Sequence, residues 1–336
     1  MKHLRTTLKF AVAVAALLTV ATGIMACTGQ NGDSWLEKIG IHIEPGDTVP
    51  PTIQVFPMQA NVGETPDFMK NVVASDSCSS VTIKVDSTTY NINAAGDYMV
   101  TYTATDSAGN VATAQAPLKV IDENTKIIYL TFDDGPSNNT GRILKILEQE
   151  GVKATFFVTA QFKDHLHFIK DEFEAGHAIA AHTYSHAFSI YRSIDTYFED
   201  LERIEQIIEA QTGQRTKIIR FPGGSNNTVN RRYAKRNIMP ELIKEVLKRG
   251  YQYVDWNLDS TDAAGVNRPA SVLIANACNA HSNQLCLLMH DTDAKNTTVE
   301  ALPTIIRYFK DQGYAFGTIT STGYVCHFST KYDNID

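Results

Sequence analysis

The sequence predicts an α/β fold, an incomplete (β/α)7-type barrel of parallel strands, preceded by a small all-β sandwich. Over residues 122–330, seven short runs of β-forming residues alternate with six amphipathic helical segments. Over residues 48–121, short strand candidates are separated by Gly, Asn and Asp turns, which is typical of an antiparallel sandwich. In a parallel barrel, side chains that do chemistry gather at the C-terminal ends of the strands. Polar residues at those ends are therefore the first candidates for a functional site.

The composition sets broad limits on the protein. The chain has 336 residues, which is long enough for two or three domains. Its hydrophobic content of 43% suits ordinary globular folding. Its formal net charge is −7 and no basic block stands out, so we do not expect nucleic acid as a partner.

The N-terminal residues 1–27 have the pattern of a targeting segment. Positive residues precede an apolar run over 10–24, which is short for a membrane span. Ile24-Met-Ala-Cys27 resembles a bacterial lipobox, which implies that Cys27 is the lipidated first residue of the mature chain. The alternative is a plain signal peptide in which Cys27 has no role. In either case we expect export, as a membrane lipoprotein facing the cell wall or as a secreted protein, with residues 28–47 as a flexible linker.

The predicted sandwich, residues 48–121, carries no catalytic constellation. The stretch 96–110 resembles the closing hairpin of bacterial immunoglobulin-like repeats. This resemblance implies an immunoglobulin-like domain that serves either as a spacer or as a sugar-binding module. The strand candidates in it are 52–56, 81–85, 98–104 and 112–120.

The barrel region shows a regular alternation of strands and helices. In the helix predicted over 195–211, apolar residues recur with helical spacing along one face. The expected strands are 127–132, 154–158, 178–181, 218–221, 251–256, 284–289 and 314–320. The expected helices are 142–150, 165–175, 195–211, 240–249, 270–280 and 298–312.

The first barrel strand ends on two adjacent carboxylates, Asp133 and Asp134. Gly135 and Pro136 then turn the chain. Because neighbouring carboxylates repel, the pair calls for a metal ion or an arginine beside it. The alternative is a polar turn that only closes the strand.

The third strand is followed by two histidines four residues apart, His182 and His186. Imidazoles at this spacing can point the same way and bind one metal ion. With Asp134 as third ligand they would leave a position open for water, which is typical of catalytic rather than structural zinc. Taken alone, this spacing more often belongs to a pair of exposed surface histidines.

Three later strands also end on candidate functional residues. Arg220 follows the fourth strand and can hold a carboxylate, while Pro222 fixes the turn and Gly223 lets a backbone N–H approach a ligand. Asp262 comes after the fifth strand. His290 ends the sixth and is a plausible general acid. Each could be an ordinary loop residue, but together they indicate one site.

The region from about 124 to 328 resembles the polysaccharide deacetylase family, which is carbohydrate esterase family 4 or the NodB homology domain. The matching motifs are Thr131–Pro136, His182–His186, Arg220–Gly223, Trp256–Ala263 and Leu288–His290. Two positions depart from the family pattern: Gly223 stands where tyrosine is frequent, and Ala263 where tryptophan is usual.

The resemblance implies a role for each motif residue. Asp133 is the implied catalytic base, held by Arg220. The implied metal ligands are Asp134, His182 and His186. The turn at Pro222 and the N–H of Gly223 are implied to stabilise the oxyanion. Leu288 is implied to line an acetyl pocket. His290 is the implied general acid, and Asp262 is implied to tune it.

The activity implied by the resemblance is metal-dependent deacetylation of a polysaccharide. Zinc is the favoured divalent metal, and cobalt or nickel would fit similar ligands. Peptidoglycan N-acetylglucosamine is the first expected substrate, with chitin-like oligomers next and O-acetyl esters such as acetylated xylan as an alternative. A non-catalytic wall-binding protein is the third hypothesis, and it would predict loss of catalytic residues that this chain retains.

Four cysteines follow Cys27, and none has the spacing of a metal site. An exported chain permits disulfides. One pair among Cys278, Cys286 and Cys326 is compatible with their positions in the predicted barrel, and Cys78 would then be free.

Overall fold

The structure is a computed structural model that describes residues 47–324 and 326–328. The predicted targeting segment, with Cys27, and nearly all of the predicted linker lie outside these ranges. Within them, no helix has the length and apolarity needed to cross a membrane. The chain divides into two compact units: one runs to Met58 and resumes over Gly63–Val120, and the other comprises Gln59–Val62 and the chain from Ile121 onward.

The N-terminal part is an all-β sandwich, as predicted from its turn-separated strands. One antiparallel sheet pairs β1 with β3, and the other has the order β2-β6-β5-β4. Alternate residues of β5, such as Val100 and Tyr102, are fully buried, which is the expected pattern of a strand with one face on a core. The strands are β1 (Thr52–Val55), β2 (Met58–Asn61), β3 (Val72–Ser75), β4 (Val81–Asp86), β5 (Gly96–Asp106) and β6 (Val111–Ile121).

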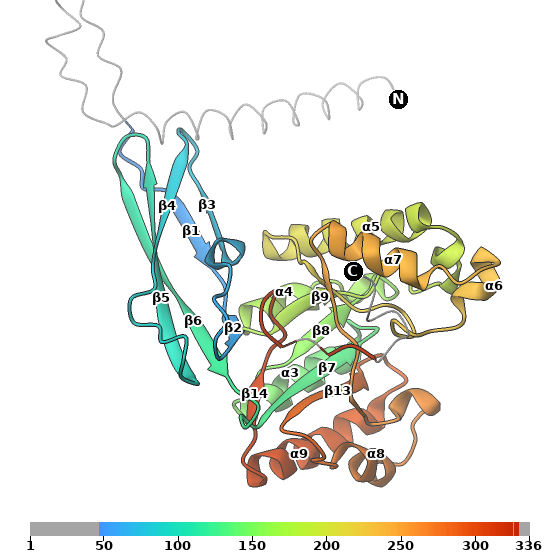
Figure 1. The fold of residues 1–336 in the computed structure, drawn as a ribbon. Coiled ribbons are helices and arrows are strands. Elements are labelled where there is room, and N and C mark those ends of the chain that lie inside the picture. The colour runs from blue at the N-terminus through green and yellow to red at the C-terminus, as the bar shows by residue number, and fades with distance from the viewer. Residues whose placement is uncertain (1–46, 325, 329–336) are drawn as a thin grey trace, which may run out of the picture. The chain divides into compact units, whose positions relative to one another are not determined.

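The C-terminal part is a curled parallel sheet that does not close, which confirms the incomplete barrel (Figure 1). The strand order is β11-β10-β9-β8-β7-β13-β12, and β14 pairs with the first half of β7. The strands are β7 (Ile127–Asp133), β8 (Thr155–Val158), β9 (Ala178–Ala181), β10 (Ile218–Ile219), β11 (Gln252–Tyr253), β12 (Leu258–Asp259), β13 (Gln284–His290) and β14 (Ala315–Gly317). The two-residue β12 was not predicted, because only its pairing with β13 distinguishes it from a loop.

Helices cover the outer face of this sheet. In the view of Figure 1, α5 and α7 lie above the strands and α8 and α9 below them. The longest, α5, begins at the N-cap Ser193 and ends at Gly213, whose left-handed conformation closes the helix. The helices are α3 (Asn138–Gln149), α4 (Phe168–Glu174), α5 (Ile194–Thr212), α6 (Asn230–Ala234), α7 (Met239–Lys248), α8 (Ala270–Ala277) and α9 (Asn296–Asp311), with short 3-10 turns η3 (Phe188–Arg192) and η4 (Asp262–Ala264) in the loops.

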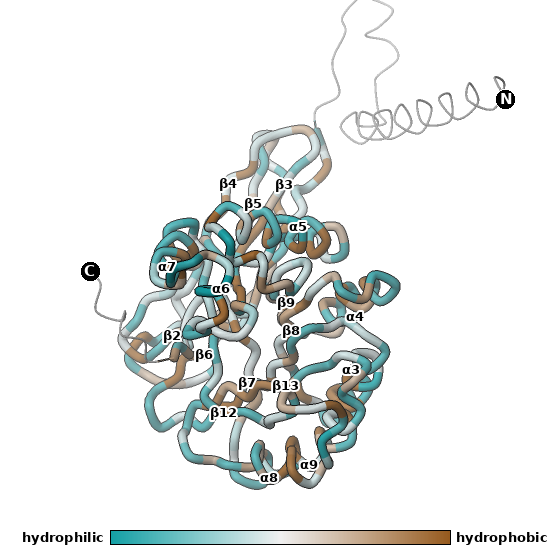
Figure 2. The backbone as a smooth tube through the Cα atoms, turned by 90° about the vertical axis from the view of Figure 1, so that its right-hand side faces the viewer, coloured by the Kyte–Doolittle hydropathy of each residue, from teal (hydrophilic) through white to brown (hydrophobic). Residues whose placement is uncertain are grey.

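Strand β7 is buried along its whole length and has two different faces. Ile128, Leu130 and Phe132 pack on the helices in the larger apolar cluster, while Ile127 and Tyr129 belong to a smaller cluster inside the curl. Figure 2 shows hydrophobic residues concentrated along β7, β8 and β13. Since side chains alternate between faces, Asp133 continues the inner face of β7 at its C-terminal end.

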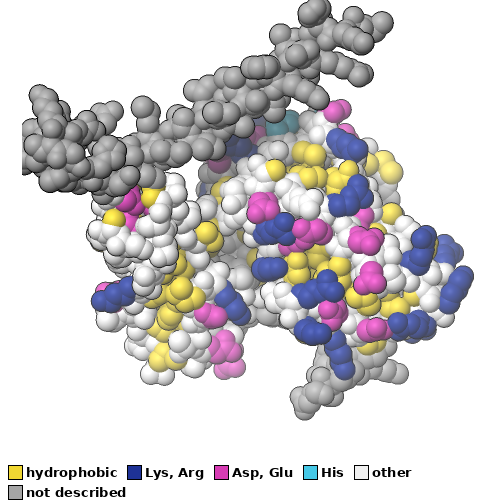
Figure 3. Space-filling view, turned by 90° about the horizontal axis from the view of Figure 1, so that it is seen from above, with side chains coloured by type: hydrophobic (Ala, Val, Ile, Leu, Met, Phe, Trp, Pro, Cys, Tyr) yellow, Lys and Arg dark blue, Asp and Glu magenta, His cyan; other side chains and the backbone are white. Residues whose placement is uncertain are grey.

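The exposed faces of α5 and α7 carry charges of both signs. Figure 3 shows lysines and arginines interspersed with acidic side chains on the face seen from above. Several are paired, for example Arg236 with Glu241 at 2.6 Å and Arg249 with Glu245 at 2.8 Å. Such exposed pairs contribute about 0–1 kcal/mol each to stability, so this surface does not explain the fold.

The cysteines differ from expectation. Cys278, Cys286 and Cys326 are all free thiols, so no pair forms among them. Sequence spacing could not decide this, because pairing depends on distances that only the fold sets.

Candidate active site

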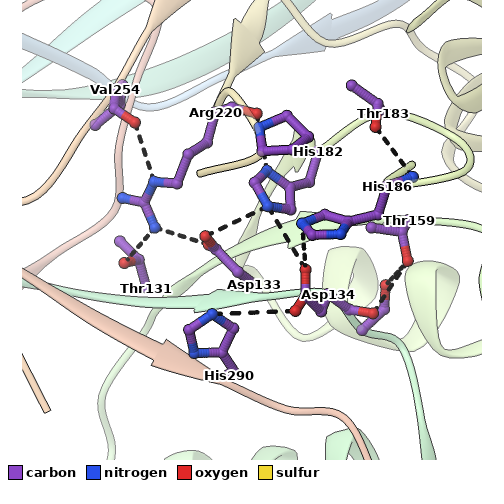
Figure 4. A network of polar contacts seen from close by, with 12 residues as sticks. Thr131, Asp133, Asp134, Thr159, His182, Thr183, His186, Arg220, Val254 and His290 are labelled. Carbon is purple, nitrogen blue, oxygen red and sulfur yellow. Dashed lines mark hydrogen bonds and ion pairs between the residues drawn. The ribbon is translucent and has the colours of Figure 1, made fainter. Parts of the chain in front are cut away.

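A network of polar side chains gathers at the C-terminal ends of β7, β9 and β13 and in the loop after β10 (Figure 4). Its centre is Asp133, which is only 2% exposed. One oxygen of Asp133 accepts a hydrogen bond from Arg220 Nη1 at 2.7 Å, and the other lies 3.7 Å from His182 Nε2. Burial raises the pKa of Asp133, and the charge of Arg220 opposes that rise.

Arg220 is completely buried, and the barrel interior satisfies its guanidinium on every side. Besides Asp133, Nη1 donates to Thr131 Oγ1 at 2.9 Å. Nε donates to the backbone carbonyl of Val254 at 3.0 Å. Nη2 donates to the backbone carbonyl of Asp255 at 2.9 Å and to the sulfur of Cys286 at 3.4 Å. Five donors with five acceptors hold the arginine rigidly, and through it the carboxylate of Asp133.

The three predicted metal ligands come together. Asp134 Oδ1 lies 3.6 Å from His182 Nε2 and 3.2 Å from His186 Nε2. Ligand atoms of all three residues lie within 4.8 Å of one another. The spacing of the two histidines and the position of Asp134 after its strand therefore predicted a real cluster.

The protonation of this cluster suits a cation. His182 Nδ1 is 2.8 Å from the backbone carbonyl of Arg220, which can only accept, so Nδ1 carries the proton. Burial lowers the pKa of His182 to about 3, so its ring is neutral and Nε2 presents a lone pair. That lone pair faces Asp134 Oδ1, a buried oxygen without a hydrogen-bond partner among the described residues. Acceptors that face each other are what a divalent ion would satisfy.

Backbone strain is concentrated at the same place. Asp134, Thr183 and His186 have φ values of 74°, 67° and 52°, in the left-handed region that non-glycine residues rarely adopt. Thr261, which precedes the turn η4, has a φ of 63°. Strained conformations of this kind persist where the surrounding structure fixes them, and they are enriched at functional sites.

His290 lies opposite the cluster, at the end of β13. Its Nε2 is 4.0 Å from Asp134 Oδ2, and its Nδ1 is 2.7 Å from Asp262 Oδ1. Asp262 Oδ2 accepts from the backbone N–H of His290 and from Thr298 Oγ1, both at 2.8 Å. Burial disfavours the charged imidazole, but the hydrogen bond and charge of Asp262 outweigh it and raise the pKa of His290 to about 9.

The remaining predicted residues border the same site. Leu288 is buried and pairs in register with Thr131, two residues before His290 on the same face of β13. Pro222 is buried, whereas Gly223 is exposed at a φ of 78°. In the part of the chain that the structure describes, no hydrogen bond from the Gly223 N–H is found.

Two buried carboxylates support the site and were missed by the sequence analysis. Asp255, fully buried, accepts from the backbone N–H and hydroxyl of Ser225 and thereby holds the loop after Gly223. Asp291 lies under the β7 turn, where a Cβ on Gly135 would clash with its carboxylate, and burial raises the pKa of Asp291 to about 7. The available signal was an acid within or directly after an apolar strand run.

Comparison with known proteins agrees with this arrangement. The family described as Polysaccharide deacetylase matches residues 121–250, and Bacterial surface protein, Ig-like domain matches residues 57–120. A peptidoglycan-N-acetylglucosamine deacetylase of Bacillus cereus is 30% identical over 207 residues, covering 60% of this chain and 72% of that protein.

Two solved structures extend the comparison to the fold. The catalytic domain of a peptidoglycan N-acetylglucosamine deacetylase from Eubacterium rectale is 40% identical, with a TM-score of 0.60 over 62% of this chain and 94% of that one. A polysaccharide deacetylase from Bacillus cereus is 29% identical, with a TM-score of 0.54 over 62% of this chain and 98% of that one. With a curled parallel sheet and the five motifs at its strand ends, this chain belongs to the polysaccharide deacetylase family, carbohydrate esterase family 4, and carries a bacterial immunoglobulin-like domain before the deacetylase domain.

Proposed function

We propose that the protein is a metal-dependent hydrolase that removes N-acetyl groups from N-acetylglucosamine of peptidoglycan. The observation that carries this proposal is the cluster of acceptors formed by Asp134, His182 and His186. It lies directly between a buried carboxylate, Asp133, and a charged imidazole, His290. A cation site flanked by a base and an acid is suited to hydrolysis of an unreactive acyl bond.

The ligand set is chemically complete for zinc. Two imidazole nitrogens and one carboxylate oxygen would hold the ion and leave room for water and substrate. When bound, such an ion polarises the acyl carbonyl and makes water more acidic. His182 needs no proton loss to act as a ligand, since burial already keeps it neutral.

Asp133 and His290 divide the proton transfers between them. Asp133, which its contact with Arg220 keeps oriented, takes a proton from the attacking water as the water oxygen bonds to the acetyl carbon. His290, protonated at neutral pH, gives its proton to the nitrogen as the carbon–nitrogen bond breaks. The products are acetate and a free amine on the sugar. The proton on nitrogen is essential, because an amide nitrogen leaves poorly without it.

The developing negative charge on the acetyl oxygen requires a donor as well. The N–H of Gly223 is the candidate, because the residue is exposed and its amide makes no hydrogen bond among the described residues. A donor of this kind contributes about 2.7–4 kcal/mol to transition-state stabilisation in comparable sites. Leu288, buried beside Thr131, would form the wall against the acetyl methyl group.

Peptidoglycan is the proposed substrate because the relatives named above that carry a substrate in their name act on it. The predicted export signal agrees with a wall substrate. We propose that lipid at Cys27 anchors the protein to the membrane and that the immunoglobulin-like domain acts as a spacer. A Cys27→Ser variant should then move from the membrane fraction to the soluble fraction.

The direct test is acetate release by the purified protein, supplied with zinc, on peptidoglycan, on chitin oligomers and on acetylated xylan. Asp134→Asn removes a ligand charge at constant size, and Asp311→Asn, an exposed carboxylate at the end of α9, is the matched control. We expect the control variant to release acetate from peptidoglycan. In Asp134→Asn, acetate release should fall at least about 100-fold and the bound zinc should be lost.

Other outcomes are informative. Release only from chitin oligomers or from xylan would reject peptidoglycan and keep the reaction class. Full activity in Asp134→Asn would refute the metal-dependent mechanism.

A further inference from the structure

The ring of Phe188 borders the catalytic cluster, although no motif includes it. Phe188 opens the turn η3, two residues after His186, and the two ring centroids are 5.9 Å apart. On its other side the ring approaches Gly223: a Cβ built on Gly223 would lie 3.3 Å from Phe188 Cε1 and 3.7 Å from Cζ. The ring therefore occupies the space between a proposed metal ligand and the proposed oxyanion donor.

The position of Phe188 is fixed relative to that donor. Its ring stacks on Tyr191 at a centroid distance of 6.4 Å. Tyr191 in turn donates its hydroxyl to the carbonyl of Pro222 at 2.9 Å, which ties η3 to the turn that presents the Gly223 N–H. Phe188 is thus held by the same contacts that shape the site.

Phe188 also differs from its neighbours in burial. Ile190 and Tyr191 are 3% and 0% exposed, as expected for side chains that only fill the core. Phe188 packs against the same core cluster but stays partly accessible. An aromatic ring that is packed against a core, yet partly accessible beside polar catalytic groups, is suited to bind a flat apolar surface.

We propose that Phe188 is the aromatic wall on which the sugar ring carrying the reacting acetyl group packs. This rests on the proposed function. The pyranose ring of an N-acetylated glycan has a face of C–H groups that can lie on an aromatic ring, while its acetamido group extends to the metal ligands and to Gly223. Phe188 would then select a sugar-borne acetyl group over an acetyl group without a ring.

The test compares Phe188→Ala and Phe188→Tyr with the wild type. Phe173→Ala is the control, since Phe173 on α4 is another partly buried phenylalanine packed against the same core. Calorimetry gives the Kd for chito-oligomers, and the rate of acetate release at different oligomer concentrations gives KM and kcat. Triacetin, which has no sugar ring, is the second substrate, and bound zinc and melting temperature are recorded for every variant.

We expect Phe188→Ala to raise the oligomer Kd and KM by about 10-fold, equivalent to about 1.4 kcal/mol, with little change in triacetin hydrolysis or bound zinc. Phe188→Tyr should bind like the wild type. An unchanged Kd and KM in Phe188→Ala would overturn the proposal. So would an equal loss on both substrates with loss of zinc, which would mean that Phe188 only supports His186.

The two proposals fail in different ways. If the wild type binds the oligomer through Phe188 but releases no acetate from any glycan, the proposed function fails and the sugar wall stands. If the wild type releases acetate with a KM that does not depend on Phe188, the function stands and the wall is rejected. A wild type that binds no glycan rejects the wall.

Discussion

Replacing Asp262 by asparagine should shift the pH range in which the enzyme works. Asp262 accepts three hydrogen bonds: from the ring and the backbone N–H of His290 and from the hydroxyl of Thr298. An asparagine has one acceptor oxygen, so in either orientation its NH2 group faces a donor. It also removes the negative charge that stabilises the protonated imidazole.

The size of the shift follows from the pKa of His290. In the structure that pKa is raised to about 9 from 6.5, against the effect of burial. A general acid acts while protonated, so activity is lost as the pH rises through its pKa. At pH 8 an imidazole with pKa 9 is about 90% protonated, and one near 6.5 about 3%. Asp262→Asn should therefore lower kcat about 30-fold at pH 8 and less than about 2-fold at pH 6.

The assay is kcat for acetate release between pH 5.5 and 9.5, with bound zinc determined for each variant. Thr298→Val is the control: it deletes one hydrogen bond to Asp262 and keeps the carboxylate, so its profile should stay close to that of the wild type. A titration of the His290 ring by NMR gives the pKa without turnover. If Asp262→Asn has the same high-pH limb as the wild type, Asp262 does not set the pKa of the general acid.

Three further predictions follow from the same contacts. Arg220→Lys keeps the charge but leaves at least two buried acceptors without a donor, and should lower the free energy of unfolding by about 2–6 kcal/mol in urea titrations. Arg215→Lys, which alters an exposed ion pair, should change the free energy of unfolding by less than about 1 kcal/mol. Equal effects of Arg220→Lys and Arg215→Lys would contradict the role given to the buried guanidinium. Gly224→Ala should destabilise the protein more than Gly213→Ala, because the φ values are similar (82° and 79°) but only the new Cβ at Gly224 would meet an aromatic carbon, at 2.8 Å. Equal urea midpoints for the two variants would mean that the loop at Gly224 relaxes freely. Chelation of zinc should abolish acetate release and lower the melting temperature, with recovery of both when zinc is restored, and a chelated enzyme of full activity would argue against the metal site.

The sequence by itself determined the layout of this protein. The alternation of strand runs with amphipathic helices predicted the parallel fold, because strands and helices each have their own spacing of apolar residues along the sequence. Helix α5 was predicted to within one residue at either end. Local spacing also gave both histidines and the acid pair, since each lies directly after a strand.

Only the tertiary structure decided how these groups meet. Arg220, after β10, reaches Asp133 at the end of β7 across 87 positions in sequence, although β8 and β9 lie between the two strands in the sheet. His290 reaches Asp262 across 28 positions, from β13 to the loop after the neighbouring β12. Asp255 and Phe188 became visible only there, because burial of a charge and the distance between two loops are properties of the assembled sheet. Periodicity fixes which residues form a strand, whereas pairing and register, which have no local signal, place the strand ends beside each other.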